Sequence, residues 1–109
     1  MSKYLLIESR DPFESADVPY YYDLAAGLAR KGHAVTLFLV QNGVLATRSG
    51  AARGAHLGRL AGAGVTVFAD DFSLRERGIG ERDLARGVKS APIGLVVERL
   101  AASWKVMFL

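Results

Sequence analysis

Two adjacent carboxylates, Asp70 and Asp71, are the residues whose types best fit acid–base chemistry. They follow an apolar run, and partial burial of one of two neighbouring like charges raises its pKa, which is how acid–base pairs are tuned. The alternative is structural, because Asp at a strand end commonly caps the next helix, and Ser73 could do so instead. Arg75 and Arg77 lie near in sequence and would neutralise the pair. The pattern therefore favours capping or turn formation over catalysis, and we expect no catalytic residue.

The absence of cysteine excludes several classes of chemistry. A chain of 109 residues with no cysteine cannot form disulfides, zinc–thiolate or iron–sulfur sites, or a thiol nucleophile. Neither His33 nor His56 has a second histidine or a carboxylate four residues on, so we expect no metal site. We interpret His33 as structural, between a helix end and a strand, and His56 as a surface residue.

Cofactor and partner classes are limited by the glycine and charge patterns. The segment from Ser9 to Ser15, after the first apolar run, contains no glycine, so the Rossmann and P-loop patterns are absent and we expect no cofactor. The net charge of +3 comes from 14 basic and 11 acidic residues that are interleaved along most of the chain, which argues against a nucleic-acid partner. A basic stretch between Arg30 and Arg59 is either a solvated helix face or a weak docking surface for an acidic partner.

Hydrophobicity predicts a cytoplasmic protein without a membrane partner. No apolar run approaches the roughly 20 residues that span a bilayer. The N-terminus lacks the apolar core and the small-residue cleavage site of a signal peptide.

Alternating strand and helix patterns predict the elements that position these residues. Apolar runs predict strands at 3–8, 34–40, 65–69 and 104–109, and a fifth strand could lie within 91–97. Helical spacing predicts helices at 18–30, 48–63 and 92–102, with Ser90 as a candidate cap for the last, and short helical segments within 70–80 and 82–88. The order predicts one α/β domain over 1–109, with a mostly parallel sheet of four to five strands and helices on both faces.

Two helices carry patterns that indicate how they pack. In the first, the residues expected to face the core are Tyr21, Leu24, Ala25 and Leu28, and at least one ring of the run Tyr20 to Tyr22 must lie off that face. In the second, four glycines spaced by four share one face and would let the helix approach a neighbour closely: Gly50, Gly54, Gly58 and Gly62.

Polar residues just after the strands form the candidate site, because ligands of parallel sheets bind beyond the carboxyl ends of the strands. We predict a pocket lined by Asp11, Asn42, Gly43, Asp70, Asp71 and Ser73.

An ordered set of segments resembles the DsrE family, which includes DsrF, DsrH, TusB, TusC and TusD. The segments are Leu-Ala-Ala-Gly-Leu-Ala-Arg-Lys-Gly-His at 24–33, Val-Thr-Leu-Phe-Leu at 35–39, Asn-Gly-Val at 42–44, Gly-Val-Thr-Val at 64–67, Leu-Arg-Glu-Arg-Gly-Ile at 74–79 and a C-terminal Val-Met-Phe. In the sulfur-transferring members, a cysteine just after the third strand carries a persulfide between proteins. The resemblance places that position at Asp70 or a neighbour, and a carboxylate cannot form a persulfide.

The resemblance implies a fold and an assembly habit without the family's chemistry. Family members form trimers and hexamers, including mixed complexes in which some subunits lack the thiol. We therefore expect a non-catalytic subunit linked to sulfur metabolism, either a homo-oligomer (trimer or hexamer) or a hetero-oligomer with related subunits. Two alternatives stay open: a metabolite-binding protein of this fold unrelated to sulfur, and an enzyme that uses Asp70 or Asp71 as a general base.

Overall fold

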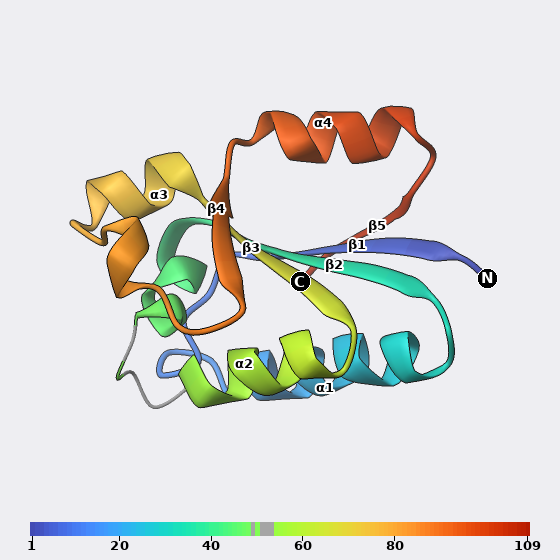
Figure 1. The fold of residues 1–109 in the computed structure, drawn as a ribbon, viewed down its shortest axis with the longest axis horizontal. Helices are drawn as coiled ribbons and strands as arrows, with labels where there is room; N and C mark the ends of the chain where they lie inside the picture. Colours follow the sequence, from blue (N-terminus) through green and yellow to red (C-terminus); the bar gives the residue numbers. More distant parts are fainter. Residues whose placement is uncertain (49, 51–53) are drawn as a thin grey trace.

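A parallel sheet organises the molecule (Figure 1), whose computed structural model describes residues 1–48, 50 and 54–109. Within this part of the chain the sheet has five strands: β1 (Lys3–Glu8), β2 (Ala34–Leu39), β3 (Val65–Asp70), β4 (Val88–Ala91) and β5 (Lys105–Phe108). Their order is β4-β3-β2-β1-β5, and each neighbouring pair is parallel. The predicted α/β class and parallel sheet are confirmed.

Helices cover both faces of the sheet, as predicted. Figure 1 shows α1 (Asp17–Arg30) and α2 (Gly54–Gly62) side by side below the sheet, and α4 (Gly94–Ala101) above it. The short helix α3 (Asp71–Glu76) follows β3 directly, and the 3-10 helix η1 (Gln41–Thr47) follows β2 closely. A second 3-10 helix, η2 (Glu81–Asp83), precedes β4. Within the described residues, no helix is both long enough and apolar enough to cross a membrane.

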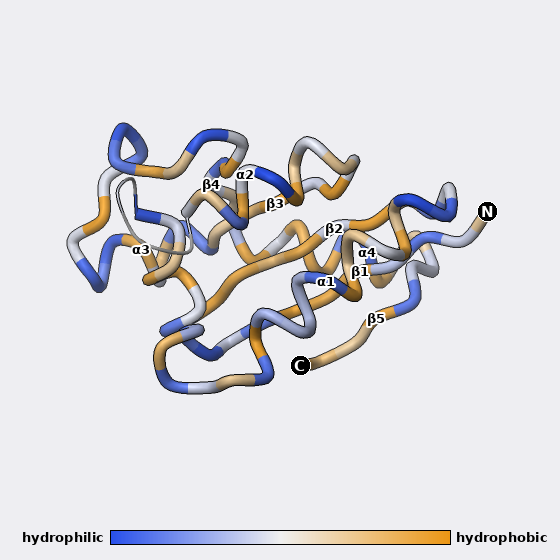
Figure 2. Tube along the Cα trace, turned by 90° about the horizontal axis from the view of Figure 1, so that it is seen from below, coloured by the Kyte–Doolittle hydropathy of each residue, from blue (hydrophilic) through white to orange (hydrophobic). Residues whose placement is uncertain are grey.

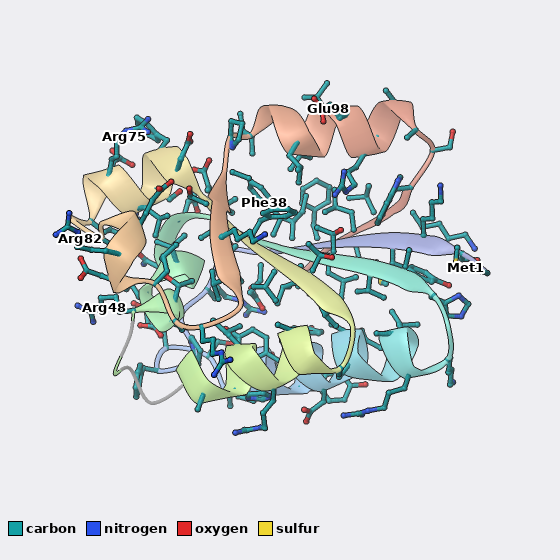
Figure 3. The ribbon with its side chains drawn as sticks, in the orientation of Figure 1. Met1, Phe38, Arg48, Arg75, Arg82 and Glu98 are labelled. Atoms are coloured by element: carbon teal, nitrogen blue, oxygen red, sulfur yellow. The ribbon has the colours of Figure 1, made fainter. Side chains whose placement is uncertain are left out.

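Alternation along the strands divides the core into two clusters. Side chains of successive strand residues point to opposite faces, so Leu6 packs in the cluster under α1 and α2 while Leu5 packs under α4. Figure 2 shows the hydrophobic residues concentrated along the central strands. In Figure 3, Phe38 of β2 lies on the α4 side of the sheet. Continuous burial of β2 explains its nearly uninterrupted apolar sequence.

The region before α4 differs from the prediction. The expected helical segment at 82–88 is the 3-10 turn η2 followed by a loop, and the fifth strand covers Val88–Ala91 and not 91–97. Ser90 lies within β4 and does not cap α4, which begins at Gly94 without a side-chain cap. Four residues are too few to show a strand period, so pairing with β3 decides this element.

The core face of α1 agrees with the prediction at Ala25, and at Leu24 and Leu28, which pack partly buried against the core, but it differs at the tyrosine. Its buried residues are Val18, Tyr22, Ala25 and Ala26. Tyr22, about 100° further round the helix, lies in the core in place of Tyr21 and shares the buried face with Val18. Tyr20 is exposed, which confirms that the tyrosine run places a ring off the core.

Close packing by glycine is confirmed for part of α2. A Cβ added at Gly54 would lie 3.3 Å from the Ala85 Cβ, and one at Gly58 would lie 3.4 Å from the Arg86 carbonyl oxygen. Gly62 has open space around it. Gly50 adopts a φ of 88° outside the helix. The predicted start of this helix includes residues 49 and 51–53, which lie outside the described part of the chain.

The surface prediction for His56 is wrong. Its side chain is only 12% exposed, and Nε2 lies 3.4 Å from Asp23 Oδ1. The ring packs edge-on against Tyr22, with 5.0 Å between centroids. His56 thus joins α2 to α1. His33 is structural as predicted, since its Nδ1 accepts a hydrogen bond from the Ser2 backbone N–H at 3.0 Å.

Candidate functional site

The carboxylate of Asp70 caps α3 at the junction with β3. Asp70 Oδ2 accepts hydrogen bonds from the Ser73 backbone N–H at 3.0 Å and from Ser73 Oγ at 2.7 Å. These contacts confirm the capping interpretation. The residue is only 7% exposed, and within the described residues Oδ1 makes no hydrogen bond.

Ser73 links this cap to the end of β2. Its hydroxyl oxygen accepts a hydrogen bond from the Gln41 backbone N–H at 2.9 Å while donating to Asp70. Gln41 has a φ of 51°, in the left-handed region that non-glycine residues rarely adopt. One buried hydroxyl therefore holds two strand ends and one unusual backbone conformation together.

Replacing Ser73 with alanine should lower the free energy of unfolding by about 1–3 kcal/mol. The variant leaves the Gln41 N–H without its acceptor and removes one donor from Asp70. Urea unfolding monitored by circular dichroism measures the loss. The matched control is Ser90→Ala, because the Ser90 hydroxyl bonds to Glu81 at an exposed position. An equal loss in both variants would contradict a special role for the Ser73 hydroxyl.

A cavity of about 390 Å³ adjoins this network at the carboxyl edge of the sheet. It lies between the strand ends, α3 and α4. Its lining is Ile7, Val40, Gln41, Asp70, Phe72, Ser73, Glu76, Ile93, Val96 and Phe108. The position agrees with the expectation for parallel sheets, whereas the apolar walls were not predicted. Apolar residues beside each strand end were the available signal for them.

Of the residues predicted to line the pocket, the structure brings Asp70 and Ser73 together at this cavity. Asp71 lines a separate depression of about 240 Å³, and its Oδ2 lies 3.8 Å from Arg75 Nη1. Arg77 does not pair with either aspartate. Its Nε and Nη2 donate to Asn42 Oδ1 at 3.3 and 3.0 Å.

The other two predicted residues have local structural contacts. Asp11 Oδ1 accepts a hydrogen bond from the Phe13 backbone N–H at 3.1 Å, which closes a turn. Gly43 lies so close to β1 that an added Cβ would be 2.5 Å from the Glu8 carbonyl oxygen. Ligand binding by the six predicted residues stays a prediction; among the cavities of the described residues, Asp70 and Ser73 share one.

Glu8 is a buried carboxylate at the end of β1 and is not one of the six predicted pocket residues. It is 0% exposed. Oε2 accepts a hydrogen bond from the Arg10 backbone N–H at 3.2 Å, while Oε1 has no partner within the described residues. Strand alternation places Glu8 on the α1 face, opposite the side of Ile7. Across the described ranges, no group of three or more His, Asp or Glu residues could hold a metal ion.

Comparison with known proteins identifies the fold. No protein-family model and no curated protein sequence matches the chain. YchN from E. coli superposes with a TM-score of 0.91 at 21% identity, with all of both chains covered. MTH1491 from Methanobacterium thermoautotrophicum, a protein of unknown function, gives 0.89 at 19% identity with the same coverage. BT1422 from Bacteroides thetaiotaomicron gives 0.77 at 14% identity, covering 97% of this chain and 94% of that one. The fold is YchN-like.

The YchN-like fold confirms the expected fold class. At these identities the likeness establishes the fold alone, since one fold hosts many functions.

Proposed function

We propose that this protein is a non-catalytic, cysteine-less DsrE-like subunit that assembles into an oligomer and binds a partner or small ligand in sulfur metabolism. The YchN-like fold and the ordered sequence segments support the family assignment. The observation that carries the proposal is the position of Asp70 at the end of β3, where the resemblance places the thiol. Its carboxylate caps α3, so the residue in that position has a structural role.

The outer side of α4 supports assembly. Ile93, Val97 and Leu100 are exposed at helical spacing on one side of this helix. Phe72 and Phe108 are also exposed, on neighbouring α3 and β5. Contiguous apolar surface of this kind commonly marks an interface. The proposed occupant is a second copy or a related subunit, and the trimeric multiplicity comes from the family resemblance.

Replacing Val97 with glutamate should break this assembly. A charge in an apolar interface is left unpaired and desolvated, which costs several kcal/mol. Multi-angle light scattering should show a trimer or hexamer for the unchanged protein and a smaller species for Val97→Glu. Tyr20→Glu is the control, since Tyr20 is exposed on α1, at the opposite face of the sheet. A monomeric unchanged protein at micromolar concentration would refute the assembly.

A second candidate function is metabolite binding with no link to sulfur. The observation in its favour is the partly apolar cavity at the strand ends. Its volume of about 390 Å³ lies within the range of small-molecule sites. General-base catalysis by Asp70 has less support, because its Oδ2 is committed to two hydrogen bonds and the described lining contains no histidine or lysine.

A further inference from the structure

We infer that the strand-end cavity selects a small organic cation with an apolar body, an alkylammonium or arylalkylammonium ion, over an anion of the same size. This inference rests on the proposed ligand-binding role; Phe72, Ile93 and Phe108 also belong to the proposed assembly surface, so the two proposals are tested by separate measurements. It follows from the combination of polar groups at the cavity, from the burial of one carboxylate and from the apolar walls.

The polar groups at the cavity offer acceptors more than donors. Two carboxylates, Asp70 and Glu76, line it, and no Lys, Arg or His is among its described lining residues. The backbone N–H of Gln41 and the hydroxyl of Ser73 already donate to partners inside the network. Apart from the Gln41 side-chain amide, the side-chain groups that remain are hydrogen-bond acceptors, which suit an ammonium group.

Asp70 supplies the principal charge. It is 7% exposed, and an ion pair at a partly buried carboxylate is stronger than one in water. The two bonds from Ser73 to Oδ2 hold the carboxylate in place and leave Oδ1 without a hydrogen bond in the described structure. Because the carboxylate is already held in place, binding a cation to its second oxygen costs no further side-chain entropy of Asp70.

The nearby cations leave Asp70 without an ion pair. Arg77 Nη1 lies 3.9 Å from Glu76 Oε1, so it partly neutralises the more exposed of the two carboxylates. Arg75 pairs with Asp71 and stands 6.0 Å from the centre of the Phe72 ring. Within the described residues, Asp70 takes part in no ion pair.

The apolar walls suit the body of such a ligand. Ile7 and Val96 are buried at the inner side of the cavity. Phe72, Ile93 and Phe108 are exposed at its rim. An alkyl or aryl chain would remove part of this surface from water, and a ring face also attracts an ammonium group.

Matched six-carbon probes test the inference directly. The full-length protein is titrated with hexylammonium, hexanoate and hexanol while amide shifts are followed by nuclear magnetic resonance. Hexylammonium should bind about tenfold more tightly than hexanoate, because the partly buried carboxylate attracts the cation and repels the anion. The shifts should centre on Gln41, on α3 and on the start of α4. Equal binding of hexylammonium and hexanoate, or no shifts with hexylammonium at millimolar concentration, would overturn the inference.

Substitutions at two neighbouring positions distinguish an effect of the Asp70 charge from an effect on the fold. Asp70→Asn keeps a side chain that caps helices as well as aspartate does, but it removes the charge. It should weaken hexylammonium binding about tenfold and leave hexanol binding unchanged. Asp71→Asn is the control, because it removes the same charge next to the cavity but outside its lining. Equal weakening in both variants would overturn the assignment of Asp70.

Light scattering on the same samples distinguishes this inference from the proposed assembly. Selective binding of hexylammonium by a monomer would support the cation site while refuting the oligomer. An intact oligomer that binds hexanoate as well as it binds hexylammonium would overturn the cation site alone.

Discussion

Replacing Gly43 with alanine should lower the free energy of unfolding by about 3 kcal/mol, at the upper end of the usual cost of overpacking. The added Cβ would lie 2.5 Å from the Glu8 carbonyl oxygen and 3.3 Å from its carbonyl carbon. These are backbone atoms of a buried strand end, so they cannot rotate away as a side chain would. The Gly43 N–H also bonds to the Ser9 and Val40 carbonyl oxygens at 3.1 and 2.9 Å, which resists movement of η1.

Gly27→Ala is the matched control for this substitution. Gly27 lies inside α1, and an added Cβ would have nothing within 4 Å. Alanine is the better helix former, so this variant should gain up to about 1 kcal/mol. Urea unfolding of both variants gives the comparison. If Gly43→Ala lowers the free energy of unfolding by no more than Gly27→Ala changes it, η1 does not pack as closely on β1 as the distances at Gly43 require.

Asp70→Cys should give a thiol with a pKa below the ordinary value of about 8.5. The carboxylate it replaces accepts bonds from the Ser73 N–H and hydroxyl, and a thiolate in that position would accept the same donors. Arg75 and Arg77 lower the pKa of this thiol less than their sequence positions indicate. Arg75 pairs with Asp71, and Arg77 contacts Asn42 and Glu76. The rate of alkylation by iodoacetamide against pH measures the pKa.

The double variant Asp70→Cys, Ser73→Ala is the control for this thiol. It removes the hydroxyl donor and keeps the backbone donor, so the pKa should rise toward about 8.5. A thiol with an unshifted titration in Asp70→Cys, in a protein that keeps its oligomeric state, would remove the main reason for linking this position to sulfur transfer. A persulfide donor should modify Asp70→Cys and leave the unchanged protein unmodified, because the latter has no thiol.

The pattern of apolar runs and helical segments is enough to predict the sheet and the edge at which the cavity lies. The runs that became β2 and β3 are nearly continuous in apolar residues, as strands covered on both faces must be, and the helical segment between them requires a parallel crossover. Parallel strands bring their carboxyl ends to one edge, and the cavity lies at that edge. Capping by Asp70 was also predictable, because its donor lies only three residues away.

Only the tertiary structure decided which polar groups meet and which side chains are buried. Ser73 joins Gln41 across 32 residues, and Arg77 joins Asn42 across 35. Local spacing carries no information about partners so far apart. For the same reason His56 is partly buried against Tyr22, and Val88–Ala91 is a strand through pairing with β3. The periodicity of a segment predicts its secondary structure from its own residues. Burial and strand pairing depend instead on the side chains and strands that the fold places next to it.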